Sequence, residues 1–298
     1  MHDDLAPRGG HMVSVSRLSA SSLERCISTS VPVRTRSSPS ISRLILVVLA
    51  GSLWGSLFDT ARGQVSTFPA LVRIVYLVPA DRPVRDDYAR HLDSAIGHVQ
   101  IWLRNELGDN LSFSTENKPV DVVATPHIAS WYSTNPNGDY DLWFWNNVLA
   151  DAFALTGARF DDPSSTWVFY IDAEGACGQL AGAGVPSVAV LPQHDLRGLA
   201  GEENIPPCPT DPVDTAGPCR WVGGLGHELG HALGLPHPQA CVDGDPTTQC
   251  PENTLMWLGY RTYPDTFLSE SDKTFLEASP FISTVHIRRS LPACTKLK

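Results

Sequence analysis

The sequence predicts an α+β fold built from four to five strands and two to three helices. Apolar, β-branched runs with the length of buried strands recur over residues 70–191. Between them, apolar residues recur at steps of three and four, which is the period of an amphipathic helix. A third observation is the segment 221–237, whose helical pattern carries histidines on one side and leucines on the other. The predicted order is strand, helix, strand, helix, strand, strand and histidine-bearing helix.

Each element has its own signal. The predicted strands are residues 70–78, 120–123, 166–171 and 185–191, and the predicted helices are 84–107 and 142–157. Proline and glycine predict loops over 126–138 and 192–220. Ser269 and Asp272 have the spacing of a capped helix start, which predicts a last helix with Phe275 and Leu276 facing inward.

The histidine-bearing segment has the spacing of a metal site. His227 and His231 are four residues apart and therefore share one face of a helix. Glu228 directly follows His227, and its carboxylate can reach a water molecule bound to the same metal. Gly234 can adopt the positive φ that ends a helix, so that His237 returns as a third nitrogen ligand. Three protein ligands leave one position of a tetrahedral zinc open, which is typical of a catalytic site.

Glycines are frequent on this helix. Gly223, Gly224, Gly226 and Gly230 are poor helix formers. They predict either close backbone packing or a helix that is held by its surroundings.

The five residues form the string H-E-x-x-H-x-x-G-x-x-H, which resembles the signature of the metzincin zinc metalloproteases. The order of elements also looks like the upper subdomain of a metzincin, with an extra helix before the third strand. The resemblance implies a twisted mixed sheet with an antiparallel edge strand and one catalytic Zn²⁺. It implies an upper subdomain over residues 64–237 and a small lower subdomain over 238–298.

The resemblance also assigns candidate residues around the metal. Metzincins carry a tight turn with a methionine beneath the metal, and Met256 is the candidate here. Some members place a tyrosine two residues later. This chain has Leu258 at that position and Tyr260 two residues further on, so contact of Tyr260 with the site is left open.

The implied edge strand is 185–191, to which an extended peptide adds as a further strand. Its candidate substrate contacts are Val185, Ser187, Val188 and Val190. Three glycines just before it, Gly178, Gly182 and Gly184, indicate either a bulge or a flexible loop.

The resemblance implies a zinc-dependent endopeptidase that acts on a protein or peptide through a zinc-activated water, with Glu228 as general base. Two alternatives stay open: a secreted zinc-holding protein without turnover, and a hydrolase of a non-peptide amide. An intact Glu228 favours an enzyme, because binding alone needs no general base. The formal net charge of −10 gives no indication of nucleic acid or an anionic membrane as partner.

Residues 1–63 predict an N-terminal extension and signal peptide. The apolar run 44–58 has the size of a signal-peptide core and is short for a membrane span. Ala61-Arg62-Gly63 supplies a cleavage site, with Gln64 as the new N-terminus. We therefore expect a secreted chain with no stable membrane association. Anchoring by residues 44–58 is the alternative.

Six cysteines follow this cleavage site: Cys177, Cys208, Cys219, Cys241, Cys250 and Cys294. An even number in an exported chain predicts disulfides, with fifteen possible connectivities. Pairing over short loops gives Cys208–Cys219 and Cys241–Cys250, which leaves Cys177–Cys294. A structural zinc is the competing use, but the chain has no C-x-x-C.

Three further sequence features are weaker indications of a binding or modification site. Asp243-Gly244-Asp245 could bind calcium, but a polar turn is favoured because no full calcium-loop pattern is present. Asn110-Leu111-Ser112 is a glycosylation acceptor if the host glycosylates. His194 lies just after the predicted edge strand and could touch substrate.

Overall fold

The computed structural model of the chain describes residues 70–202, 208, 217–244 and 249–285. The chain divides into two units, 1–64 and 65–298, and all described residues belong to the second. The predicted signal peptide, its cleavage site, Asp245 and Cys294 lie outside the described residues. Within the described ranges, no helix combines the length and the apolar character needed to span a bilayer.

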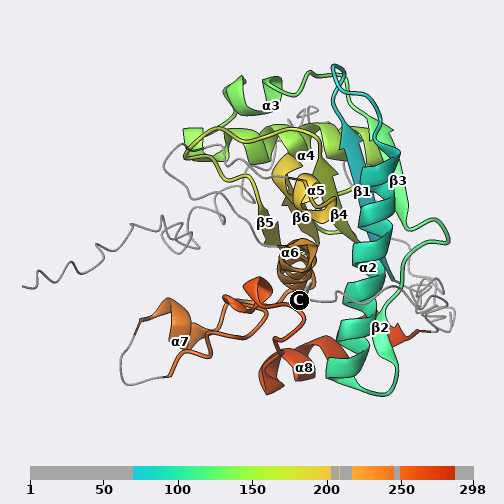
Figure 1. Cartoon of the computed structure of the whole chain (residues 1–298), viewed down its shortest axis with the longest axis vertical. Coiled ribbons are helices and arrows are strands. Elements are labelled where there is room, and N and C mark those ends of the chain that lie inside the picture. The colour runs from blue at the N-terminus through green and yellow to red at the C-terminus, as the bar shows by residue number, and fades with distance from the viewer. Residues whose placement is uncertain (1–69, 203–207, 209–216, 245–248, 286–298) are drawn as a thin grey trace, which may run out of the picture. The chain divides into compact units, whose positions relative to one another are not determined.

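A five-stranded mixed sheet organises the second unit (Figure 1). Its strands are β1 (Leu71–Val78), β3 (Val120–Ala124), β4 (Ser165–Ile171), β5 (Ala183–Val185) and β6 (Val188–Leu191). Their spatial order is β3-β1-β4-β6-β5. The pairs β1·β3, β1·β4 and β4·β6 are parallel, and β5 pairs antiparallel with β6. The five strands and the antiparallel edge agree with the prediction.

Helices cover both faces of this sheet and are more numerous than the two to three expected. They are α2 (Asp86–Leu107), α3 (Trp131–Thr134), α4 (Trp143–Thr156), α5 (Gln193–Leu199), α6 (Pro218–Ala232), α7 (Gln239–Val242) and α8 (Glu270–Glu277). Two 3₁₀ turns, η2 (Tyr140–Leu142) and η3 (Gly259–Arg261), complete the helical elements. A small antiparallel pair joins β2 (Leu111–Phe113) to β7 (Ile282–Thr284). The predicted α+β class therefore understates the layering of helices around the sheet.

The strands are buried on both sides. Ile74 and Tyr76 of β1 contribute to the core shared with α2, α5 and α6, whereas Val75 and Leu77 contribute to the core shared with α4. Every residue of β4 is buried. This explains why β1 and β4 have nearly continuous apolar sequences, since parallel strands packed on both faces lose the usual polar alternation.

The predicted strand 185–191 is wrong in one respect, because it is two strands. β5 ends at Val185, Pro186 and Ser187 form the turn, and β6 begins at Val188. Ser187 has φ 76°, the left-handed value that a proline-led turn of this kind requires at its second central residue. β6 lies between β4 and β5, so Val188 and Val190 are fully buried and cannot meet substrate. The edge strand is β5.

Two predicted loops contain helices. The 126–138 segment includes α3, and the 192–220 segment includes α5 and the start of α6. Tyr132 and Leu196 are fully buried, and this burial stabilises short helices that their proline-rich surroundings do not predict. At the last helix the capping box of Ser269 and Asp272 is confirmed. Leu276 is buried as expected, but Phe275 is 49% exposed.

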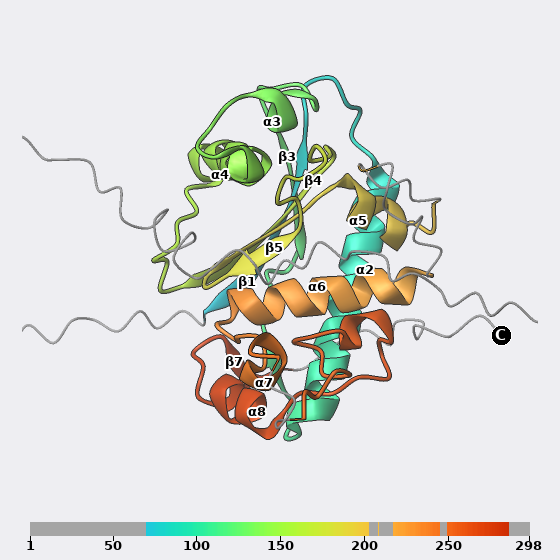
Figure 2. The ribbon, with the colours of Figure 1, turned by 90° about the vertical axis from the view of Figure 1, so that its left-hand side faces the viewer.

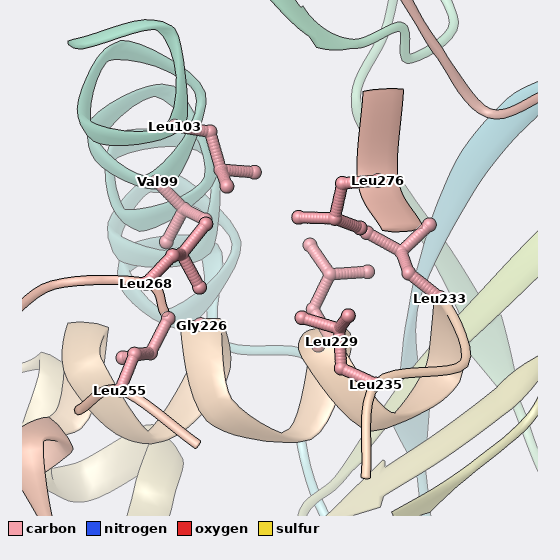
Figure 3. Close-up of a pocket in the computed structure, with 10 residues that line it drawn as sticks. Val99, Leu103, Gly226, Leu229, Leu233, Leu235, Leu255, Leu268 and Leu276 are labelled. Carbon is pink, nitrogen blue, oxygen red and sulfur yellow. The ribbon is translucent and has the colours of Figure 1, made fainter. Parts of the chain in front are cut away.

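Helix α6 lies between the sheet and the C-terminal elements (Figure 2). On the side of α6 that faces α2 and α8, apolar side chains from several elements point toward one another (Figure 3). Val99 and Leu103 come from α2, Leu229 from α6 and Leu276 from α8, and all four are buried. This cluster holds α6 against both neighbours.

We expect Leu229→Ala to lower the free energy of unfolding by about 2–5 kcal/mol, the usual cost of removing a buried leucine. Leu229 is 2% exposed and lines the cluster of Figure 3. Urea denaturation measures the loss. Val84→Ala, at a residue that is 53% exposed, is the control and should change stability by no more than about 0.5 kcal/mol. Equal stabilities of the two variants would show that α6 is not held by this cluster.

Candidate metal centre

The end of α6 turns the chain back on itself. The Gly234 amide donates to the His231 carbonyl and the Leu235 amide to the Gly230 carbonyl, both at 2.9 Å. These are the two bonds of a Schellman motif, and Gly234 has the positive φ, 101°, that the motif needs. The expected helix stop at Gly234 is therefore confirmed. The reversal brings His237 back toward the helix.

Three imidazole nitrogens converge at this point. The Nε2 atom of His231 lies 3.2 Å from that of His227 and 3.0 Å from that of His237. The remaining separation, His227 to His237, is 3.3 Å. These three histidines could hold one metal ion.

Hydrogen bonds determine which ring nitrogen of His227 and of His231 carries the proton. The Nδ1 atom of His227 lies 2.7 Å from the Leu255 carbonyl oxygen, and that of His231 lies 2.7 Å from the Leu235 carbonyl oxygen. A carbonyl only accepts, so each Nδ1 carries the proton and each Nε2 keeps its lone pair. Such backbone contacts also orient metal-binding histidines.

Burial keeps the rings neutral. It lowers the pKa of His227 to about 3 and that of His231 to about 4, with repulsion between the rings acting in the same direction. The pKa of His237 is also lowered by burial. All three are therefore in the neutral form that binds metal at pH 7.

The spacing fits zinc. Tetrahedral ligands with Zn–N bonds of about 2.0–2.1 Å stand about 3.3 Å apart, close to the separations between the three Nε2 atoms. The unprotonated Nε2 atoms of His227 and His231 cannot hydrogen-bond to each other, whereas a cation can bind both together with His237. Neutral imidazoles suit zinc better than calcium or magnesium, which prefer oxygen ligands.

Glu228 lies beside this cluster in the sequence and is half-buried. Burial raises the pKa of its carboxyl to about 8, and the charge of Asp195 acts in the same direction. Arg220 and a hydrogen bond with the backbone of Gly184 oppose the shift. A nearby cation opposes it further, because positive charge favours the carboxylate. The group can therefore exchange a proton near neutral pH.

A tight turn packs against the face of α6 that carries Gly230. The Trp257 amide donates to the Thr254 carbonyl at 3.0 Å, and Met256 between them is fully buried. A Cβ on Gly230 would overlap the Met256 Sδ. The same turn presents the Leu255 carbonyl to His227. Close backbone packing, one of the two readings of the helix glycines, therefore applies at Gly230.

We expect Gly230→Ala to destabilise the protein by about 1–3 kcal/mol, because the new methyl group would displace Met256. Zinc affinity should fall as well, since Met256 follows the carbonyl that orients His227. Gly226→Ala on the same helix is the matched control: its Cβ would meet Leu255 at an ordinary 3.5 Å. Thermal unfolding and zinc titration of both variants test this. Tight zinc binding by a stable Gly230→Ala protein would contradict it.

Aromatic rings flank the histidines. The ring centre of Tyr260 is 5.2 Å from that of His227, and the ring centre of Trp257 is 5.2 Å from that of His237. The Tyr260 hydroxyl accepts a bond from Arg261 Nε at 3.3 Å. The sequence left open whether Tyr260 contacts the site, and its ring packs beside His227.

The disulfides differ in part from the prediction. Cys241–Cys250 is confirmed. Cys208 pairs with Cys177, with 4.8 Å between their Cα atoms, so the predicted Cys208–Cys219 and Cys177–Cys294 pairs are wrong. Cys219 is disulfide-bonded as well. Loop length alone predicted the wrong partner, because the fold brings Cys177 beside Cys208, which is 31 positions away in the sequence.

The other candidate site residues do not belong to the three-histidine cluster. His194 bonds to Glu174 at 2.9 Å and Asp195 at 3.2 Å, so it belongs to an internal polar cluster. Asp243 accepts a bond from Gln239 at 2.6 Å, and the calcium prediction stays untested. Nothing in the sequence predicts that Gly184 and Asp195 lie near Glu228, because no local pattern links residues from different elements.

The described geometry therefore defines a mixed-sheet protein with a candidate three-histidine zinc centre. No protein-family model and no curated protein sequence matches the chain. Among solved structures, OgpA from Akkermansia muciniphila is similar at 18% identity and a TM-score of 0.49, over 73% of this chain and 63% of that one. Archaemetzincin from Methanopyrus kandleri is similar at 16% identity and a TM-score of 0.36, over 69% of this chain and 93% of that one.

A catalytically inactive OgpA has been solved with an O-glycopeptide, glycodrosocin, as its substrate; it is 16% identical to this chain, with a TM-score of 0.47, over 72% of this chain and 61% of that one. The chain thus spans less than two thirds of the length of OgpA.

Proposed function

We propose that the protein is a secreted, metzincin-type zinc endopeptidase. The observation that carries this proposal is the convergence of three histidine Nε2 atoms at the spacing of zinc ligands, with Glu228 next to the first of them. Export is supported by the predicted signal peptide and by the two disulfides among the described residues.

The three histidines would hold the ion through their Nε2 atoms, and three protein ligands are typical of a catalytic zinc site. When bound there, zinc would supply Lewis acidity for the scissile carbonyl and for a water nucleophile at neutral pH. Glu228 accepts the proton of the attacking water and passes it to the leaving amine. Its raised pKa suits the second transfer, because the carboxyl can hold the proton until the amine leaves.

The edge strand β5 positions the peptide. A Cβ on Gly184 would overlap the Glu228 carbonyl and approach the His231 Cβ to 2.8 Å, so β5 lies directly against the residues of the centre. An extended peptide that pairs with the outer edge of β5 therefore passes the metal. Val185 stays a candidate contact in this arrangement, whereas Ser187 belongs to the turn.

The turn that carries Met256 is the support of the site in this proposal. It keeps the Leu255 carbonyl on His227 while the methionine fills the space below Gly230. The upper subdomain 64–237 contributes the sheet and α6, and the lower subdomain 238–298 contributes the turn and α8.

Digestion of a peptide library by the zinc-loaded protein, with mass spectrometry of the products, tests the function. We expect internal cuts in extended peptides, at sites that share a preference. A protein that holds one zinc ion per chain and cuts no peptide would instead be a zinc-holding binding protein or a hydrolase of another amide.

A further inference from the structure

We propose that His194 is a positioning residue of the peptidase: as an imidazolium between Glu174 and Asp195, it fixes the edge strand β5 relative to the metal helix α6. This proposal rests on the peptidase function proposed above and adds a residue on which peptide binding depends. His194 acts through the two elements that would lie along an extended peptide.

Both ring nitrogens of His194 face carboxylates. Its Nδ1 atom lies 2.9 Å from both carboxylate oxygens of Glu174, in the loop that follows β4. Its Nε2 atom lies 3.2 Å from the Oδ2 atom of Asp195, the next residue of α5. A carboxylate only accepts, and a neutral imidazole has one N–H, so only the imidazolium can donate to both groups. We call these three residues the carboxylate–imidazolium bridge.

The charges around His194 favour its protonated form. Burial acts to lower the pKa of His194, but the hydrogen bond with Glu174 and the negative charges of Asp195 and Glu174 outweigh burial and raise the pKa. The positive charge of Arg220 on α6 opposes this shift. The balance of these effects agrees with the geometry, which requires two N–H groups on the ring.

Two further elements bring ionisable groups to this region. On β4, burial and then the charge of Asp195 keep the pKa of the Tyr170 hydroxyl well above its usual value, so that the hydroxyl is neutral at pH 7. On α2, which also packs against α5, Arg85 pairs with Glu202. His194 is the type of residue whose charge changes near neutral pH, and we therefore expect its proton to control the bridge.

Close packing connects Glu174 to the edge strand. The Glu174 carboxylate also accepts a bond from the His194 amide at 2.7 Å, so α5 holds it at two points. The next residue, Gly175, lies so close to Ala181 that a Cβ on it would stand 3.0 Å from the Ala181 Cβ. Ala181 is two residues before Ala183, where β5 begins. A displacement of Glu174 would therefore move the start of β5.

Asp195 connects the bridge to the metal helix. Asp195 is buried, and a Cβ on Gly224 of α6 would lie 3.5 Å from its Oδ1 atom. Gly224 and Glu228 are four residues apart, so they share one face of α6. The bridge thus joins the start of β5 to the turn of α6 that precedes Glu228.

Loss of the His194 proton should weaken the bridge. A neutral ring can donate to one carboxylate only, and its other nitrogen then directs a lone pair at the second carboxylate. Because the pKa is raised in the folded protein, the stabilisation is complete below the ordinary histidine pKa of about 6.5 and is lost as pH rises through the folded value. β5 should then shift relative to α6, and a peptide should bind less tightly.

Nitrogen-15 NMR of the zinc-loaded full chain tests the charge of His194. The resonances of its ring are identified by their loss in His194→Gln. We expect the ring to titrate with a midpoint above the ordinary value of about 6.5. Glu174→Gln should lower this midpoint, because it replaces a carboxylate with a neutral amide. A midpoint at or below the ordinary value, or one that Glu174→Gln leaves unchanged, would overturn the proposal.

Steady-state kinetics on a library-selected peptide test the positioning role. At pH 6.5 we expect His194→Gln to raise KM by about 3–10-fold while kcat stays within about twofold of wild type. The ratio of the two KM values should approach one as pH rises, because wild type then loses the same contact. His91→Gln, at an exposed histidine of α2, is the matched control and should keep the wild-type KM at each pH. A KM ratio that is independent of pH, or a loss in kcat alone, would contradict the positioning role.

Thermal unfolding gives a readout that does not depend on turnover. The Tm of His194→Gln should lie below that of wild type at pH 6, and the difference should shrink as pH rises through the His194 midpoint. A difference that stays constant with pH would count against the bridge. If His194→Gln does not fold, Glu174→Gln, which keeps the shape of its side chain, should show the same convergence in weaker form. Zinc-loaded wild type that cuts no peptide would refute the peptidase function instead, and the NMR and unfolding titrations would still decide whether the bridge exists.

Discussion

Glu228→Gln is expected to bind zinc normally and to lose turnover by a factor of about 10²–10⁴, the usual worth of a positioned acid–base group. Glutamine has the size of glutamate but cannot accept the proton of the attacking water. The three Nε2 atoms do not involve Glu228, so the metal should stay in place. Zinc content by atomic emission, beside cleavage of a library-selected peptide, measures both effects.

The control for this variant is Glu270→Gln on α8, a carboxylate whose side chain is 90% exposed. It should retain full activity. Wild-type turnover in the Glu228→Gln protein would eliminate Glu228 as the general base, even if zinc and cleavage were both established for the wild type.

The second large effect is expected for the metal ligands. His231→Ala removes the nitrogen that lies 3.2 Å and 3.0 Å from the other two, so the remaining pair cannot enclose the ion. Loss of an outer partner of a ligand commonly costs about 10–100-fold in metal affinity, and loss of the ligand itself should exceed this. Cleavage should disappear with the metal. Competition with a chromophoric chelator gives the zinc affinity.

His91→Ala supplies the matched control, because His91 is an exposed histidine of α2. It removes an imidazole without touching the cluster. If His231→Ala held zinc as tightly as His91→Ala, the three-histidine assignment would be wrong.

The metal helix could be predicted because its information is local. Ligands four residues apart, a glycine at the stop and a third histidine just beyond it are encoded in one short stretch. Helix geometry then converts spacing into position, and the Schellman bonds at Gly234 show how the reversal is achieved. The strands β1 and β4 could be predicted equally well, because strands that are buried on both faces require long apolar runs in the sequence.

Features that depend on distant segments could not be predicted. The apolar residues of 185–191 conceal a two-residue turn at Pro186 and Ser187, so the edge strand was assigned a few residues too late. The Cys177–Cys208 bond joins residues 31 positions apart, and no sequence signal favours it over shorter loops. The packing of Tyr260 against His227 likewise appears only when η3 and α6 are brought together.

Removal and return of the metal tests the central claim most directly. The full chain is treated with a chelator, assayed on a library-selected peptide, and then titrated with zinc while cleavage and bound metal are measured together. We predict that cleavage is lost with the metal and recovers in proportion to zinc, reaching its maximum at one ion per chain. Cleavage that persists without metal, or a chain that regains one zinc ion and remains inactive on every peptide, would contradict a zinc peptidase centred on His227, His231 and His237.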